Sequence, residues 1–142
     1  MTMKTYILLL MVFLTACSAK SQKNMDTTLE IDFQDFFKND TVSLKIGDQF
    51  VLKDITVNSG FSTGLTDLCV KVFFDEDESL VQFGSKTIRI NNVVRPIIIV
   101  VYLNGNKNEY AIDLKQGKYI GFSKKSNALL DFTQAKEPFE YD

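Results

Sequence analysis

The side chains that could do chemistry in this 142-residue chain are limited by what the chain lacks: it has no histidine and only two cysteines, Cys17 and Cys69. Histidine is the commonest general base and the commonest metal ligand. Its absence excludes a Ser-His-Asp triad, a Cys-His pair and an imidazole-bound zinc. The net charge is −2, so electrostatics do not favour nucleic acid. We therefore expect no enzyme and no nucleic-acid partner.

The densest charged group is the acidic run at residues 75–78, Asp-Glu-Asp-Glu. Clustered carboxylates are the ligands that calcium prefers. If the run began an EF-hand loop, Leu80 would stand where glycine is needed and Lys86 where the bidentate glutamate belongs. We interpret the run as a solvated acidic turn between two strands. We expect no metal and no cofactor.

The first 17 residues have the order of a secretory signal, with a positive charge at Lys4 followed by an apolar run that ends at Leu14. This run is too short to cross a membrane, which takes about 20 residues. The four residues that follow it, Leu14-Thr15-Ala16-Cys17, resemble the lipobox of bacterial lipoproteins. The resemblance implies a signal peptide over 1–16 and a lipid on Cys17. The alternative is an ordinary signal peptide that leaves Cys17 as a free thiol.

The residues after the expected cleavage site indicate where such a lipoprotein would go. Lipoproteins of the inner membrane carry aspartate after the lipidated cysteine, whereas this chain has Ser18. The resemblance therefore implies the outer membrane, and the absence of an acidic run over 18–24 favours its periplasmic side. Residues 17–28 are small and polar, which predicts a flexible tether. The membrane, through the lipid anchor, is thus the first expected partner.

From Leu29 onward, apolar and polar residues alternate in short segments separated by turn residues. The pattern predicts an all-β domain over 29–142, a single antiparallel β-sandwich of about eight or nine strands. A change of phase near Lys53-Asp54 predicts a β-bulge. The expected strands are 29–33, 42–46, 50–57, 68–74, 88–90, 96–103, 110–114, 119–122 and 129–132.

Residues 96–103 are apolar throughout and predict a central strand covered on both faces. A four-residue loop over 104–107 would pair Val101 with Tyr110 and Ile99 with Ile112. The region 96–123 resembles the transthyretin-like, carboxypeptidase-regulatory class of sandwich found on many envelope proteins. The chain also resembles short lipoproteins of the cell envelope.

The second face of the central strand presents the candidate partner-binding residues Ile98, Val100 and Tyr102. Either another segment of the chain covers them, such as the tail Phe139–Tyr141, or they form an open patch with Tyr102 as its aromatic anchor. Phe61, in a glycine-rich loop, is a further candidate contact, unless it folds back over the end of the sandwich.

The sequence also supports expectations for one cysteine and two threonines. We expect Cys69 to be a buried, inert cysteine that packs as a small hydrophobe. Thr27 and Thr41 follow aspartate in triplets that resemble an O-glycosylation pattern of some Gram-negative periplasmic machineries. The absence of modification is the simpler expectation at both.

These observations favour a membrane-anchored envelope lipoprotein with a non-enzymatic structural or partner-binding role. The alternative is a binding module for a glycan or peptide. A hydrolase that uses paired carboxylates ranks third, because the chain has no tryptophan to form a sugar platform.

Lipidation can be tested directly. When the chain is expressed in a Gram-negative host, it should incorporate radiolabelled palmitate and fractionate with membranes, since acyl chains bury CH₂ groups at about 0.8 kcal/mol each. The Cys17→Ser variant should lose both properties. A Cys17→Ser variant that keeps both would contradict the lipobox.

Overall fold

The computed structural model describes residues 29–60, 64–75, 77–91 and 93–141. These residues form ten β-strands and one short 3₁₀ helix, so the all-β prediction is confirmed. No helix in the described ranges is long and apolar enough to cross a membrane. The elements are β1 (Leu29–Phe33), β2 (Asp40–Ile46), β3 (Gln49–Val57), β4 (Cys69–Phe74), β5 (Glu78–Phe83), β6 (Lys86–Asn91), β7 (Ile97–Leu103), β8 (Asn106–Ile112), η1 (Leu114–Gln116), β9 (Tyr119–Lys124) and β10 (Leu130–Ala135).

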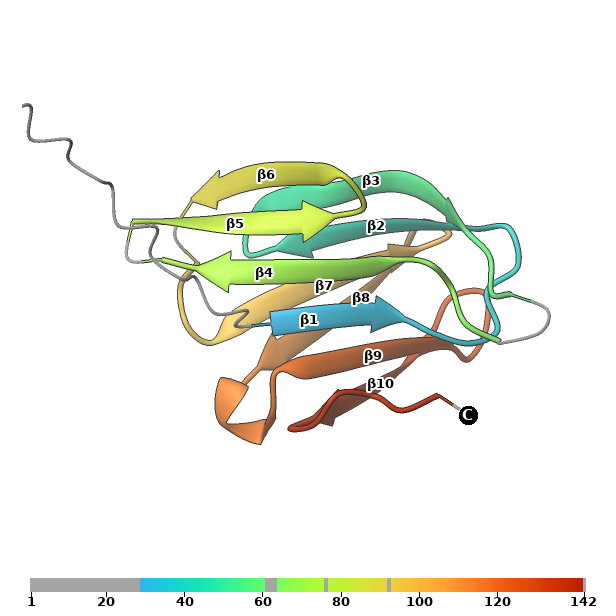
Figure 1. Cartoon of the computed structure of the whole chain (residues 1–142). Helices are drawn as coiled ribbons and strands as arrows, with labels where there is room; N and C mark the ends of the chain where they lie inside the picture. The colour runs from blue at the N-terminus through green and yellow to red at the C-terminus, as the bar shows by residue number, and fades with distance from the viewer. Residues whose placement is uncertain (1–28, 61–63, 76, 92, 142) are drawn as a thin grey trace, which may run out of the picture.

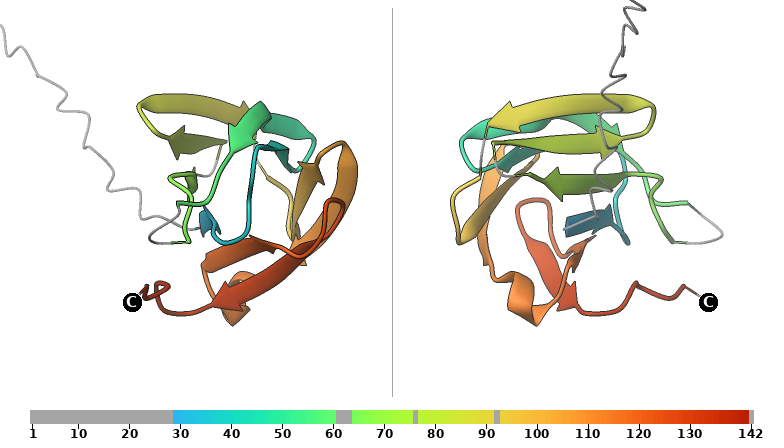
Figure 2. Two further views of the ribbon diagram at one scale, coloured as in Figure 1. Left: turned by 90° about the vertical axis from the view of Figure 1, so that its right-hand side faces the viewer. Right: turned by 60° about the vertical axis from the view of Figure 1, so that its left-hand side comes forward.

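The strands form two sheets that pack as a sandwich (Figures 1 and 2). The six-stranded sheet has the order β10-β9-β1-β4-β5-β6, and the four-stranded sheet has the order β3-β2-β7-β8. Neighbouring strands are antiparallel except for β1 and β9, which run parallel. The first strand therefore lies inside the six-stranded sheet, hydrogen-bonded on both sides.

Alternation along each strand turns one set of side chains into the space between the sheets. In β1, for example, Leu29, Ile31 and Phe33 are fully buried while the residues between them are partly exposed. Removing such apolar surface from water is the main stabilising term, at about 25 cal/mol per Å². The largest fully buried side chains are Phe33, Phe122, Leu29, Ile31, Leu44, Ile46, Ile97, Ile99, Leu103, Ile112, Ile120 and Val42.

The alternation does not predict β5. The inward positions of this strand hold Ser79, Val81 and Phe83, whereas Leu80 is half-buried on the opposite side. A polar residue on the inner face and a large apolar residue on the outer face weaken the alternation by which a half-buried strand is found in a sequence. Its pairing with β4 and β6 forms it instead.

The hairpin of β7 and β8 differs from its predicted register by two residues. Its turn is the two-residue pair Asn104-Gly105, whose φ angles of 50° and 81° are those that a tight hairpin needs. Val101 therefore lies opposite Asn108, and Ile99 lies opposite Tyr110. The predicted register paired apolar residues with one another, whereas the observed one buries Asn108. Its side-chain amide is satisfied there, because it donates to Ala128 O at 2.9 Å and accepts from Leu130 N–H at 3.4 Å.

The hairpin of β2 and β3 contains the predicted bulge and a second register shift that the sequence did not predict. At the first, Asp54 has a φ of 51°, and its N–H donates to Ser43 Oγ at 2.9 Å. At the second, Val51 is the extra residue, because Leu44 pairs with Leu52 while Lys45 pairs with Phe50. This second shift turns Phe50 onto the outer face of the sheet, whereas strict alternation with the buried Leu52 would put both side chains on the inner face.

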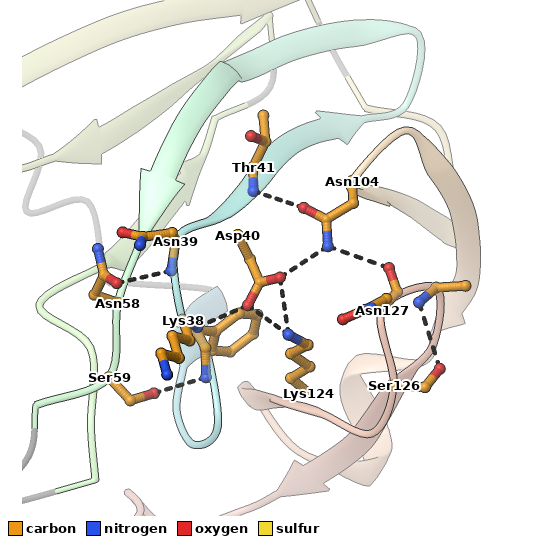
Figure 3. Close-up of polar contacts among 12 residues, drawn as sticks. Lys38, Asn39, Asp40, Thr41, Asn58, Ser59, Asn104, Lys124, Ser126 and Asn127 are labelled. Atoms are coloured by element: carbon orange, nitrogen blue, oxygen red, sulfur yellow. Dashed lines mark hydrogen bonds and ion pairs between the residues drawn. The ribbon is translucent and has the colours of Figure 1, made fainter.

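A buried ion pair joins the two sheets at one end of the sandwich (Figure 3). Asp40 of β2 is only 3% exposed, and Lys124 Nζ of β9 donates to both of its carboxylate oxygens at 2.9 Å. The same carboxylate accepts from Asn104 Nδ2 at 2.8 Å and from Lys38 N–H at 2.7 Å. Burial by itself would raise the pKa of Asp40, but these hydrogen bonds and the Lys124 charge together lower it.

We expect Asp40→Asn to reduce the unfolding free energy by about 3 kcal/mol at pH 7, because it leaves the Lys124 charge without its partner. The measurement is urea denaturation. Asp131→Asn is the control, because this carboxylate meets Lys125 at an exposed position and should leave stability nearly unchanged. Equal losses of unfolding free energy in the two variants would show that the buried ion pair contributes no more to stability than the exposed one.

The pH dependence of the same variant follows from the lowered pKa of Asp40. Stability from a depressed carboxyl pKa is complete above the unfolded-state value of about 3.9 and is lost as pH falls through the folded-state value. The difference in unfolding free energy between the wild type and Asp40→Asn should therefore shrink between pH 7 and about pH 2. A constant difference over this range would contradict the assignment.

Candidate functional site

The outer face of the four-stranded sheet is the face of β3, β2, β7 and β8 that points away from the core. The candidate residues Ile98, Val100 and Tyr102 lie together on it and line a groove of about 480 Å³. The rest of the lining comes from the end of β2 and the β2–β3 turn, from Asn91 at the end of β6, from residues 93–96 and from Lys107 and Glu109 of β8. The structure thus brings all three β7 residues into one hollow.

The C-terminal tail does not cover this groove, so that expectation is wrong. The Tyr141 hydroxyl accepts from Gln34 Nε2 at 2.9 Å, and Gln34 directly follows β1 of the other sheet. Figure 1 shows the end of the chain beside β9 and β10. Residues 136–141 also lie outside the strands, so the tail does not form an edge strand.

The floor and the walls of the groove differ in exposure. Val100 is only 5% exposed because its direct neighbours across the sheet, Lys45 and Glu109, carry long side chains on either side of it. Ile98 and Tyr102 are half-buried, which leaves apolar surface open to solvent. Val100 therefore forms the floor of the groove. Ile98 and Tyr102, on the same face of β7, are the residues available for contact.

Phe50 and Tyr102 form an aromatic pair with ring centroids 5.9 Å apart, and Phe50 is 47% exposed. Lys45 Nζ and Lys53 Nζ lie 5.4 Å and 5.8 Å from the Phe50 centroid, within range of a cation–π interaction. Tyr102 and Phe50 also line a second hollow of about 210 Å³ next to the Asn104-Gly105 turn. Tyr102 is therefore shared by both hollows.

The opposite rim of the groove comes from residues 93–96, which precede β7. Val94 is 82% exposed, the highest value among the large apolar side chains of the described residues. Arg95 beside it adds a positive charge, and the Arg95-Pro96 peptide is cis. Sequence patterns do not single out Val94 or Phe50 as contact residues. Val94 lies in a loop, and Phe50 reaches the outer face only through a register shift that the sequence does not predict.

Charges of both signs surround the apolar floor. Lys45, Arg95 and Lys107 are positive, while Asp48 and Glu109 are negative. Lys107 Nζ lies 2.8 Å from Glu109 Oε2, and the hydrogen bond and charge of Glu109 raise the pKa of Lys107. Such a face can bind a ligand through apolar contacts, aromatic contacts and ion pairs.

Several sequence candidates lie outside the described residues, namely Cys17, Thr27 and Phe61. Thr41 is exposed on the rim of the second hollow. Of the acidic run, Asp75 and Asp77 lie between β4 and β5, and Glu78 is the first residue of β5, where Arg89 meets it at 3.3 Å. The described residues of the run therefore lie where β4 connects to β5, as predicted.

Cys69 does not pack in the core as a small hydrophobe. It is half-buried on the outer face of the six-stranded sheet, because its neighbour Val70 takes the inward position. Burial first, then the carboxylates of Asp32 and Glu30, raise the pKa of the thiol. The thiol therefore stays protonated at neutral pH, which agrees with the predicted low reactivity but not with the predicted location.

The loss of stability on substitution should distinguish the buried floor of the groove from its exposed contact surface. Val100→Lys should cost several kcal/mol, because it forces a charge into a nearly closed position. Phe50→Ser should cost about 1 kcal/mol or less, because the ring is already half in solvent. Urea denaturation of both variants measures this difference, and a Phe50→Ser loss as large as that of Val100→Lys would place Phe50 in the core instead.

Comparison with known proteins gives no further assignment: no protein-family model, no curated protein and no solved structure matches this chain. The resemblances to the lipobox and to transthyretin-like sandwiches therefore stay predictions.

Proposed function

We propose that this protein is a non-enzymatic envelope lipoprotein, anchored through Cys17 to the periplasmic side of the outer membrane, which binds a partner protein. The binding surface is the outer face of the four-stranded sheet. Its ligand is an extended segment of another envelope protein. The groove of about 480 Å³ lined by Ile98 and Tyr102 is the observation that carries the proposal.

The composition of this face supports a protein ligand. An apolar floor with a polar, charged rim is the general anatomy of protein–protein interfaces. Tyrosine is enriched among the residues that contribute most to binding, and such residues lie near the centre of the contact. Tyr102 has this place, because it belongs to both hollows.

A glycan is a weaker candidate for the same face. The exposed ring here is Phe50, and two lysine ammonium groups already lie near it, Lys45 Nζ and Lys53 Nζ. An approaching sugar would have to displace these lysines to stack on the ring. An apolar side chain from a peptide can instead enter the groove next to Ile98, while acidic groups of the peptide meet the lysines.

The start of the described chain bears on how such an anchor would be attached. The described chain starts at Leu29 in β1, which belongs to the six-stranded sheet. The proposed binding face belongs to the other sheet and points away from β1. An anchored protein would thus keep this face free for a partner.

Site-specific photocrosslinking in the native host tests the proposal. A photoreactive benzoylphenylalanine is placed at Phe50 or Tyr102 in the full chain, and at Leu80 as the control. Leu80 is half-buried beside another hollow, of about 240 Å³, on the six-stranded sheet. We expect a discrete, protease-sensitive adduct at Phe50 and Tyr102 but not at Leu80, and we expect Ile98→Lys to abolish it.

Two outcomes would overturn the proposal. An adduct that resists protease and is removed by glycosidases would identify a glycan ligand instead. Adducts of equal yield at all three positions, or none at Phe50 and Tyr102, would show that this face has no specific partner. Circular dichroism of Ile98→Lys must match the wild type for its result to count.

A further inference from the structure

A second group of reactive side chains lies on the outer face of the six-stranded sheet, away from the proposed partner-binding face. Glu30 and Asp32 of β1 and Cys69 of β4 bring one potential ligand atom each to within 4.8 Å of one another. Cys69 Sγ lies 3.8 Å from Glu30 Oε1. These three side chains supply two oxygens and one sulfur to a common point.

The pairing of the strands fixes this geometry. Asp32 lies directly opposite Cys69 across the β1–β4 ladder, and Glu30 is two residues earlier, on the same face of β1. β1 is also paired with β9, so it is held from both sides. The ligand atoms therefore converge in the folded backbone without any loop having to close.

Negative charge at this point is only partly balanced. The facing cation is Lys71, whose Nζ lies 3.9 Å from Glu30 Oε2 while its own side chain is largely exposed. Burial, with a contribution from the Glu30 charge, raises the pKa of Asp32 in spite of a hydrogen bond from Cys69. Tyr141 and Gln34, which bond to each other at the end of β1, bring no positive charge.

We propose that Glu30, Asp32 and Cys69 form a three-ligand site for a thiophilic divalent cation of the Zn²⁺ class. Zn²⁺ combines cysteine sulfur at about 2.3 Å with carboxylate oxygen at about 2.0–2.2 Å. Ca²⁺ and Mg²⁺ take oxygen ligands only, so the thiol selects against them. Cys69 binds as the thiolate, and its proton passes to solvent as the metal–sulfur bond forms.

The proposed site has a definite structural effect. Three protein ligands leave the fourth tetrahedral position to water. The ion would join β1 to β4, because the ligands come from both strands. Binding to the native state alone stabilises it by mass action, so Zn²⁺ should raise the thermal midpoint.

The test uses the full chain with Cys17→Ser, which leaves Cys69 as the one thiol of the molecule. Co²⁺ is the spectroscopic probe, because a cobalt–thiolate bond gives a charge-transfer band in the near ultraviolet. We expect this band with Co²⁺ alone, its disappearance on addition of Zn²⁺, and a higher thermal midpoint with Zn²⁺ but not with Ca²⁺. Cys69→Ser should lose the band and weaken Zn²⁺ binding at least tenfold.

Matched variants separate a built site from surface charge. Asp32→Asn should weaken Zn²⁺ binding, whereas Asp131→Asn, at an exposed position on β10, should not. If Asp32→Asn fails to fold, Glu30→Gln replaces it. Absence of the Co²⁺ band in the parent chain, or unchanged Zn²⁺ affinity after Cys69→Ser, would overturn the proposal.

Discussion

The carboxylate of Asp40 connects both sheets of this molecule and the turn between β7 and β8. It receives Lys124 from the six-stranded sheet and Asn104 from the β7–β8 turn. Asn104 also accepts from Thr41 N–H at 2.9 Å and donates to Asn127 O at 3.2 Å. One buried charge therefore ties a strand of each sheet to the turn that sets the register of β8.

That register decides which side chains surround the partner-binding face. With the turn at Asn104-Gly105, Tyr102 lies opposite Lys107 and Val100 lies opposite Glu109. In the predicted register, shifted by two residues, Glu109 would lie opposite Tyr102 and Ala111 opposite Val100, so Lys107 would be separated from the aromatic pair. A buried ion pair is often costly for stability, and here its hydrogen bonds position a surface several residues away. Each sheet also has an outer face of its own, so the two outer faces carry different side chains although both sheets pack on the same core.

The sequence was most informative where one interaction dominates a segment. Alternation identified β1 and the apolar run identified β7 as strands, although the outer face of β7 is only partly covered, with Ile98 and Tyr102 half-buried. It was less informative where partners distant in sequence decide the outcome. Asn108 is acceptable in the core only because Ala128 and Leu130 bond its amide. Phe50 changes faces through one extra residue, and β5 forms through its neighbours.

The candidate residues show the same division. Ile98, Val100 and Tyr102 follow from the period of a strand, so their common face was predictable. The groove around them was not, because residues 93–96 and the β2–β3 turn close it from elsewhere in the chain. Cys69 has apolar neighbours, but the alternation of Val70 and Val72 puts it on the opposite, outer face of β4, so the phase of the strand is the better guide to its place. Glu30 and Asp32 carried no signal until β1 was paired with β4.

The position of β1 also has a mechanical consequence. A force applied to β1 at Leu29 along the strand axis runs parallel to the strand, while the hydrogen bonds to β4 and β9 run across it. Such a force loads both ladders in shear, so many bonds must break together. A strand at a sheet edge pulled sideways would instead peel away one bond at a time. Resistance to forced unfolding is a rate property, governed by the unfolding barrier, and this topology raises that barrier at the end of the domain where a tether would pull.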